Sequence, residues 1–277
     1  MLGKIKDSQN NLSLSVYLLI VFALSWPFQF FIFIWPESTW AFKMLLVSMV
    51  MVTIGTIISA KIVFKDSLSE AGWSWGRPIH YLAALVLPIL VWIVPTIYSL
   101  FLGPQTMPIN FNFIDAFFLF LTSFVITLIP AFGEEFGWRG YLLPRLVRNY
   151  SIKKALLIQA FIWWGWHLPV LVFSGMTSSL IKGNVIFSIM AMLAISIIPS
   201  MMHAIVFSYF WTTSNSLVVV TVYHSAFDEI RDTAQSSVGL GPLVEIWQMI
   251  LLTIVGLIFL WKVRWAQLKI IQDKYWA

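Results

Sequence analysis

The chain carries a dense cluster of ionisable residues, Glu134, Glu135 and Arg139, at the end of a long apolar stretch. On an α-helix, Glu135 and Arg139 share one face, whereas Glu134 lies about 100° around the helix from Glu135. We therefore expect Arg139 to hold Glu135 in an ion pair and to leave Glu134 free to face a cavity as a general base. The alternative is a solvated helix end, since Arg145 and Arg148 follow.

A histidine, His167, lies in a tryptophan-rich segment at residues 163–169. Pro169 frees a backbone carbonyl near the imidazole, because proline has no N–H to donate to it. Trp163 precedes the histidine by one turn and could fix the ring. A functional histidine and a core histidine with satisfied hydrogen bonds both fit this pattern.

A second histidine, His224, is four residues from Asp228, so both side chains point the same way from one helix. A hydrogen bond between them would fix the tautomer of the imidazole. Both groups could instead contact a reacting oxygen, or form a buried polar pair that only locks helix packing.

Taken together, these acids and histidines suit the activation of a water molecule. They suit a His–His–carboxylate metal site equally well, and the spacing leaves both interpretations open. The H-E-x-x-H pattern of soluble zinc proteases is absent. Among the remaining candidates, His203 is expected to pack in a helix interior rather than line a cavity, and Asp115 and Glu245 to be solvated near segment ends.

The composition indicates where these residues must be positioned. Of 277 residues, 60% are hydrophobic and only 10% are charged, which excludes a soluble globule, a disordered chain and a nucleic-acid binder. The chain has no cysteine, which excludes disulfides, thiolate metal sites and a cysteine nucleophile. An all-α, polytopic membrane protein is predicted, with its polar site in a cavity within the helix bundle.

A membrane-spanning helix needs about 20 apolar residues, and about eight transmembrane helices are expected. Short connections favour a single integral-membrane domain over 1–277, with a motif-bearing core at about 112–230. The expected spans are 13–35, 41–64, 80–102, 112–133, 154–173, 185–210, 215–230 and 242–262.

The basic residues predict the orientation, because cytoplasmic loops are enriched in lysine and arginine. With eight spans, 14 of the 17 basic residues fall on one side, and only Lys43, Lys182 and Arg231 fall on the other. Both termini are therefore expected in the cytoplasm. The compact chain and its short loops favour a prokaryotic plasma membrane.

The three polar segments, in this order, resemble the intramembrane CAAX-protease and bacteriocin-processing family, which includes the type II CAAX prenyl endopeptidases. Its pattern is Glu-Glu-x-x-x-Arg, then Phe-x-x-x-His, then His-x-x-x-Asn or Asp. Glu134, Glu135 and Arg139 match the first motif, His167 the second, and His224 with Asp228 the third. Trp163 stands where phenylalanine is usual. The motifs cover residues 134 to 228, and the first 110 residues carry no signature.

The resemblance implies a membrane-embedded protease in which Glu134, with His167, activates a water molecule for attack on a peptide carbonyl. His224 and Asp228 would stabilise the oxyanion, while Glu135 and Arg139 would support the site or contact the substrate. A glutamic mechanism without a cofactor is favoured. The alternative is a Zn²⁺ enzyme with Glu134, His167 and His224 as ligands.

Asp228 needs a particular role, because an ionised carboxylate would repel an oxyanion. It must either be protonated or orient His224, and we hypothesise the second role. The expected partners are a peptide or lipid-modified protein substrate and membrane lipids, with no nucleic acid. Substrate sequence, prenylation and oligomeric state remain open. The competing function is a non-catalytic bacteriocin-immunity or membrane scaffold protein of the same family; a transporter is less favoured, since no internal repeat is evident.

Overall fold

The computed structural model describes residues 2–101, 108, 111–178 and 183–265, and this part of the chain contains helices and no strand. The all-α prediction is confirmed. The α-helices are α1 (Leu2–Ile34), α2 (Thr39–Ile57), α3 (Pro78–Pro88), α4 (Val94–Phe101), α5 (Phe113–Glu135), α6 (Leu143–Asn149), α7 (Ile152–Trp166), α8 (Leu168–Thr177), α9 (Val185–Ser214), α10 (Leu217–Val238) and α11 (Pro242–Lys262). Three π-helical segments, η1 (Ile58–Val63), η3 (Ile89–Ile93) and η4 (Phe136–Leu142), and one 3-10 turn, η2 (Ser69–Ala71), connect or extend them.

Within the described residues, six helical segments are long and apolar enough to cross a membrane. The pair α7 and α8, bent by 52°, makes a seventh if it is one span. The remaining expected span, 215–230, corresponds to α10, which has 22 residues but is not among these segments. Its second half carries Asp228, Glu229, Arg231 and Asp232, and it packs inside the bundle against α5, α3 and α9. The chain is thus a polytopic integral membrane protein.

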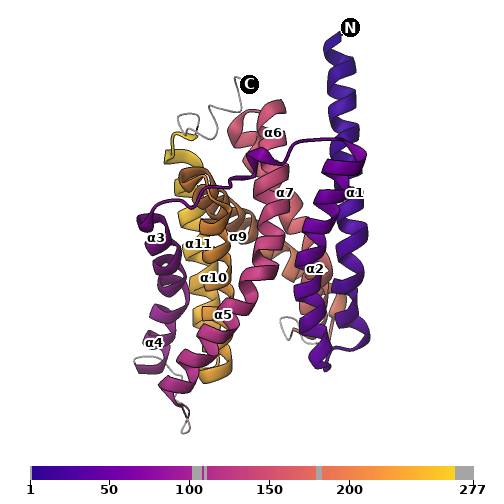
Figure 1. The fold of residues 1–277 in the computed structure, drawn as a ribbon. Coiled ribbons are helices and arrows are strands. Elements are labelled where there is room, and N and C mark those ends of the chain that lie inside the picture. The colour runs from indigo at the N-terminus through magenta and orange to yellow at the C-terminus, as the bar shows by residue number, and fades with distance from the viewer. Residues whose placement is uncertain (1, 102–107, 109–110, 179–182, 266–277) are drawn as a thin grey trace.

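Figure 1 shows that α1 begins and α11 ends at the same end of the bundle, where α6 also lies. Two ion pairs at this end join α6 to the connection between α2 and α3. Arg145 lies 2.7 Å from Asp66, and Arg148 lies 2.5 Å from Glu70. Of the basic residues used to predict the orientation, Lys182, Lys269 and Lys274 lie outside the described residues.

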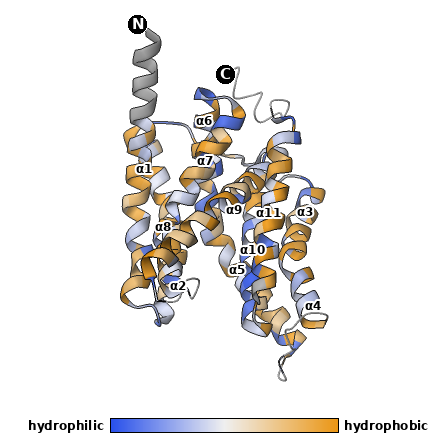
Figure 2. Cartoon of the chain, turned by 180° about the vertical axis from the view of Figure 1, so that it is seen from behind, coloured by the Kyte–Doolittle hydropathy of each residue, from blue (hydrophilic) through white to orange (hydrophobic). Residues whose placement is uncertain are grey.

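The outer surface of the bundle is apolar, as a lipid-facing surface must be. Figure 2 shows mostly hydrophobic residues on α1, α2, α3 and α11, and hydrophilic residues on α10 and at the end near α6. Helix α5 illustrates the change along a single element: Ile129 is 72% exposed, whereas Ala131 and the two acids that end the helix are buried. The C-terminal end of α5 therefore carries its charges into the interior.

Candidate active site

A cavity of about 1140 Å³ lies inside the bundle, with walls from α1, α2, η3, α5, α7, α8, α9, α10 and α11. Four of the six predicted site residues line it: Glu134, His167, His224 and Asp228. The other two, Glu135 and Arg139, do not line it and are fully buried. Of the two adjacent acids, only Glu134 lines the cavity, as expected from their positions on different faces of the helix.

The end of α5 is held in place by close packing against α2. A Cβ atom on Gly133 would lie 3.0 Å from Cα of Val50, and one on Gly137 would lie 2.4 Å from Cγ1 of Val52. The hydroxyl of Thr53 donates a hydrogen bond to the carbonyl of Gly133 at 2.6 Å. Larger residues at these glycines would push α2 away, so the small residues fix the acids that follow Gly133.

The chain continues from Glu135 into the π-helical segment η4, all of whose residues are buried. π-helical turns within helices are frequent at functional sites. Despite the wider turn, Nη1 of Arg139 donates to Oε1 of Glu135 at 3.0 Å, so the predicted ion pair is present. Nη2 of Arg139 donates to the carbonyl of Ala204 in α9 at 3.2 Å, and the guanidinium lies 4.5 Å from the ring centre of Phe207. The pair ties α5 to α9.

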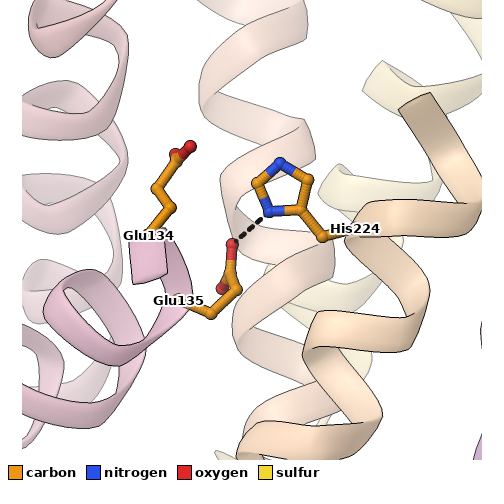
Figure 3. A group of neighbouring side chains, drawn as sticks. All are labelled: Glu134, Glu135 and His224. Atoms are coloured by element: carbon orange, nitrogen blue, oxygen red, sulfur yellow. Dashed lines mark hydrogen bonds and ion pairs between the residues drawn. The ribbon is translucent and has the colours of Figure 1, made fainter. Parts of the chain in front are cut away.

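Glu134 is 1% exposed, and its carboxylate accepts a hydrogen bond from Nε1 of Trp163 at 2.5 Å. Figure 3 shows Glu134 and Glu135 extending in different directions from the end of α5, with His224 approaching Glu135 from α10. The contact between Trp163 and Glu134 was not predicted from sequence. A signal for it exists, because a buried indole N–H almost always needs an acceptor and Trp163 stands where the family pattern has phenylalanine.

His167 lies at the break between α7 and α8, where its backbone N–H turns to the carbonyl of Trp164. Nδ1 of His167 lies 2.8 Å from the carbonyl oxygen of Trp163. This carbonyl can only accept, so Nδ1 carries the proton and Nε2 of a neutral ring is left unprotonated. The imidazole also contacts the indole rings of Trp163 and Trp166, with ring centres 4.4 and 4.7 Å away. The aromatic neighbour expected from the sequence is present, but the carbonyl beside the ring is that of Trp163, whereas Pro169 would free that of Gly165.

His224 lies between two carboxylates. Its Nδ1 is 2.8 Å from Oε1 of Glu135, and its Nε2 is 3.3 Å from Oδ2 of Asp228. The contact with Asp228 follows the predicted spacing, whereas the contact with Glu135 joins residues 89 positions apart and has no sequence signal. Asp228 is held in turn by Arg231 at 3.2 Å. Both nitrogens can donate at once only when the ring carries two protons.

The remaining ionisable candidates are divided between packing and the cavity. His203 lines the cavity, and its Nε2 lies 2.9 Å from the hydroxyl of Tyr223, while its ring packs 4.2 Å from that of Phe227. It therefore combines the two roles considered from the sequence. Glu245 is exposed and also lines the cavity, whereas Asp115 is exposed in the first turn of α5 and does not.

One group of potential metal ligands has donor atoms within 4.8 Å of one another in the described part of the chain: Glu134, Glu135 and His224. His167, expected as a ligand in the metal-dependent alternative, is not in this group. Oε1 of Glu135 already accepts from Arg139 and from His224, so a cation there would face a guanidinium. A cation would have to use Oε2 of Glu135, which is buried without a hydrogen-bond partner among the described residues.

Fold and site together define an integral membrane helical bundle with an internal cavity lined by carboxylates and histidines. Residues 116–230 match the family described as type II CAAX prenyl endopeptidase Rce1-like. A stretch of 58 residues, 20% of this chain, is 40% identical to a CAAX prenyl protease 2 from Methanococcus maripaludis and spans 21% of that relative. Residues 116–230 are thus similar to the CAAX protease family, the family that the motifs at 134–228 resemble.

Proposed function

We propose that the chain is an intramembrane endopeptidase that hydrolyses a peptide bond in a membrane-associated peptide or protein tail. The observation that carries the proposal is the division between the two acids. Glu134 lines a cavity together with His167, His224 and Asp228, while Glu135 is engaged by Arg139 and His224. The similarity of residues 116–230 to a family of endopeptidases supports a protease over a scaffold or an immunity factor without catalytic activity.

Glu134 and His167 act on the attacking water. The hydrogen bond from Trp163 holds one oxygen of the Glu134 carboxylate and leaves the other for the water. His167, with its proton on Nδ1, offers Nε2 as a second acceptor. Two acceptors on one water orient its lone pair toward a carbonyl carbon, and the proton passes to Glu134 as the C–O bond forms. Glu134 then gives this proton to the amide nitrogen as the C–N bond breaks, so that the leaving group departs as an amine.

His224 acts on the carbonyl oxygen, and Asp228 positions His224. A His224 ring that is protonated on both nitrogens supplies an N–H and a positive charge near the developing oxyanion. The Nε2 contact with Asp228, at 3.3 Å, is the longer of the two contacts, so it is the one that a substrate oxygen replaces. Asp228, held by Arg231, orients the ring before substrate binds.

The substrate enters at the end of the bundle opposite the chain termini or laterally from the bilayer. The cavity is lined by Phe42 in the first turn of α2, Thr177 at the end of α8 and Glu245 in the first turn of α11, which all lie at that end. With both termini in the cytoplasm, this entrance faces away from the cytoplasm.

Cleavage by purified protein in lipid nanodiscs tests the proposed activity. Fluorogenic peptides with an apolar segment are incubated with the native chain and with Glu134→Ala, with and without a chelator. We expect cleavage by the native chain in both conditions and none by the variant. Retained turnover in Glu134→Ala would remove Glu134 from the chemistry, and loss of native activity on chelation would establish a metal mechanism.

The absence of cysteine makes the orientation testable by single-cysteine labelling in whole cells. Ser69→Cys lies in the connection between α2 and α3, and Glu37→Cys lies between α1 and α2; both native side chains are exposed. A membrane-impermeant maleimide should label Glu37→Cys and not Ser69→Cys. The reverse labelling pattern would place both termini outside the cytoplasm and the cavity entrance on the cytoplasmic side.

A further inference from the structure

The cavity extends well beyond the proposed catalytic residues, and its far part carries an uneven distribution of charge. Along α10, the residues after His224 that line it include Asp228, Glu229, Arg231 and Asp232, and α11 adds Glu245. Four carboxylates thus accompany one arginine in this part of the cavity.

The arginine is already shared between two of these acids. Arg231 lies 3.2 Å from Asp228 and 2.6 Å from Asp232. Glu229 is 4% exposed and accepts a hydrogen bond from the hydroxyl of Thr127, and no cationic side chain among the described residues pairs with it. Burying an ionised carboxylate costs free energy unless a cation pairs with it. A positively charged group of a ligand would therefore be stabilised beside Glu229.

A second, separate acceptor lines the same cavity from α1. Gln29 is 1% exposed, and Oε1 of its amide has no hydrogen-bond donor in the described part of the structure. Buried polar atoms are almost always hydrogen-bonded, so an orphan carbonyl oxygen in a cavity wall indicates a donor supplied by a ligand. A peptide N–H is a donor of this kind.

Other walls of the cavity are apolar. Leu45, Leu46 and Met49 line it from α2, Val170 from α8 and Ile195 from α9. An occupant therefore meets apolar side chains on these walls, the Gln29 acceptor on α1 and an excess of carboxylates on α10 and α11.

We propose that this part of the cavity binds a basic side chain of the substrate, so that the protease prefers peptides with lysine or arginine close to the scissile bond. This inference rests on the proposed function for the position of that bond. From His224 to Glu229 and Asp232 the helix rises about 8 to 12 Å at roughly 1.5 Å per residue. An extended peptide covers about 3.3 Å per residue, so the basic residue lies about two to four residues from the scissile bond.

Peptide binding tests the inference separately from catalysis. Glu134→Gln protein is placed in nanodiscs of zwitterionic lipid, which do not attract basic peptides electrostatically. Matched apolar peptides carry either lysine or its uncharged isostere norleucine at one position, and their dissociation constants are measured by fluorescence anisotropy. We expect the lysine peptide to bind about tenfold more tightly, a difference equivalent to about 1.4 kcal/mol.

Glu229→Gln and Glu245→Gln, combined in the same background, should reduce this preference to less than about threefold. Glu37→Gln removes a negative charge from the turn between α1 and α2, outside the cavity lining, and should leave the preference unchanged. Gln29→Leu should weaken lysine and norleucine peptides equally, because its acceptor faces the peptide backbone.

Equal binding of the two peptides, no binding of either, or a preference that survives in the double variant would overturn the inference. A lysine preference in binding, together with no cleavage of any peptide by the native chain, would support the inference and contradict the proposed catalysis. The two hypotheses therefore fail on different measurements.

Discussion

The C-terminal end of α5 separates two polar regions that differ in their surroundings. On the cavity side, Glu134 receives one indole hydrogen bond and faces open space near His167. On the packed side, Glu135 is fully enclosed between Arg139 and His224. The surroundings of the Glu134 carboxylate thus suit a reacting water, whereas those of the Glu135 carboxylate suit holding helices together.

Burial alone does not identify a reactive carboxylate, since both acids are buried to a similar degree. What distinguishes them is the number of partners already engaged. Glu135 binds two cationic partners through Oε1, and its Oε2 is buried away from the cavity lining without a partner among the described residues. An acid held in this way positions its neighbours, whereas Glu134, which lines the cavity, can take a proton from water. Variants on either side should therefore have different consequences for stability and for activity.

The largest loss of stability is expected on the packed side, from Arg139→Ala. Removing one partner of a buried ion pair leaves an uncompensated charge and costs about 3–5 kcal/mol. Arg145→Ala is the matched control, because the ion pair of Arg145 with Asp66 is partly exposed and should cost about 1 kcal/mol or less. Thermal unfolding in detergent compares the two, and equal shifts in Tm would show that the Glu135–Arg139 pair does not hold the fold.

A smaller effect, on catalytic activity, is expected from Asp228→Asn, at the boundary between the two regions. The variant keeps the shape of the side chain but loses the charge that orients His224, so kcat/KM should fall about tenfold and its pH profile should change. Asp115→Asn, in the exposed first turn of α5, should change neither. If Asp228→Asn cleaves like the native chain at every pH, an ionised orienting role for Asp228 is excluded.

The smallest effect is expected on the cavity side, from Trp163→Phe, which removes the hydrogen bond to Glu134. A loss of about two- to tenfold in kcat corresponds to the net value of one hydrogen bond. Trp138→Phe is the control for lost volume, since Nε1 of the buried Trp138 has no partner among the described residues. Equal losses of activity in both variants would assign the effect to packing.

Much of the fold was predictable, because apolar stretches of spanning length directly reflect the lipid environment. The 154–173 span was less well predicted, since it is two helices bent by 52° around His167. Pro169 provided a signal for that bend. The π-helical segment η4 was not predictable, because no local pattern distinguishes it from a continuing α-helix.

Within the site, the contacts that sequence spacing predicted are the local ones. Glu135 with Arg139 and His224 with Asp228 are four residues apart, and both pairs form. The bonds from Trp163 to Glu134 and from His224 to Glu135 join different helices, so they depend on packing that spacing does not encode. The shape of the cavity and the participation of Gln29 from α1 are likewise visible only in three dimensions.

The most direct test of the account is a paired measurement on Glu134→Gln and Glu135→Gln, with Tm and peptide cleavage recorded for each. Glu134→Gln should lose at least about 100-fold in kcat, the contribution of a general base, with little change in Tm. Glu135→Gln should lower Tm substantially, because Arg139 and His224 lose their shared anion, and should retain measurable cleavage at temperatures where it is folded. Turnover by Glu134→Gln, or an equal loss of Tm in both variants, would contradict the division of roles between the two acids.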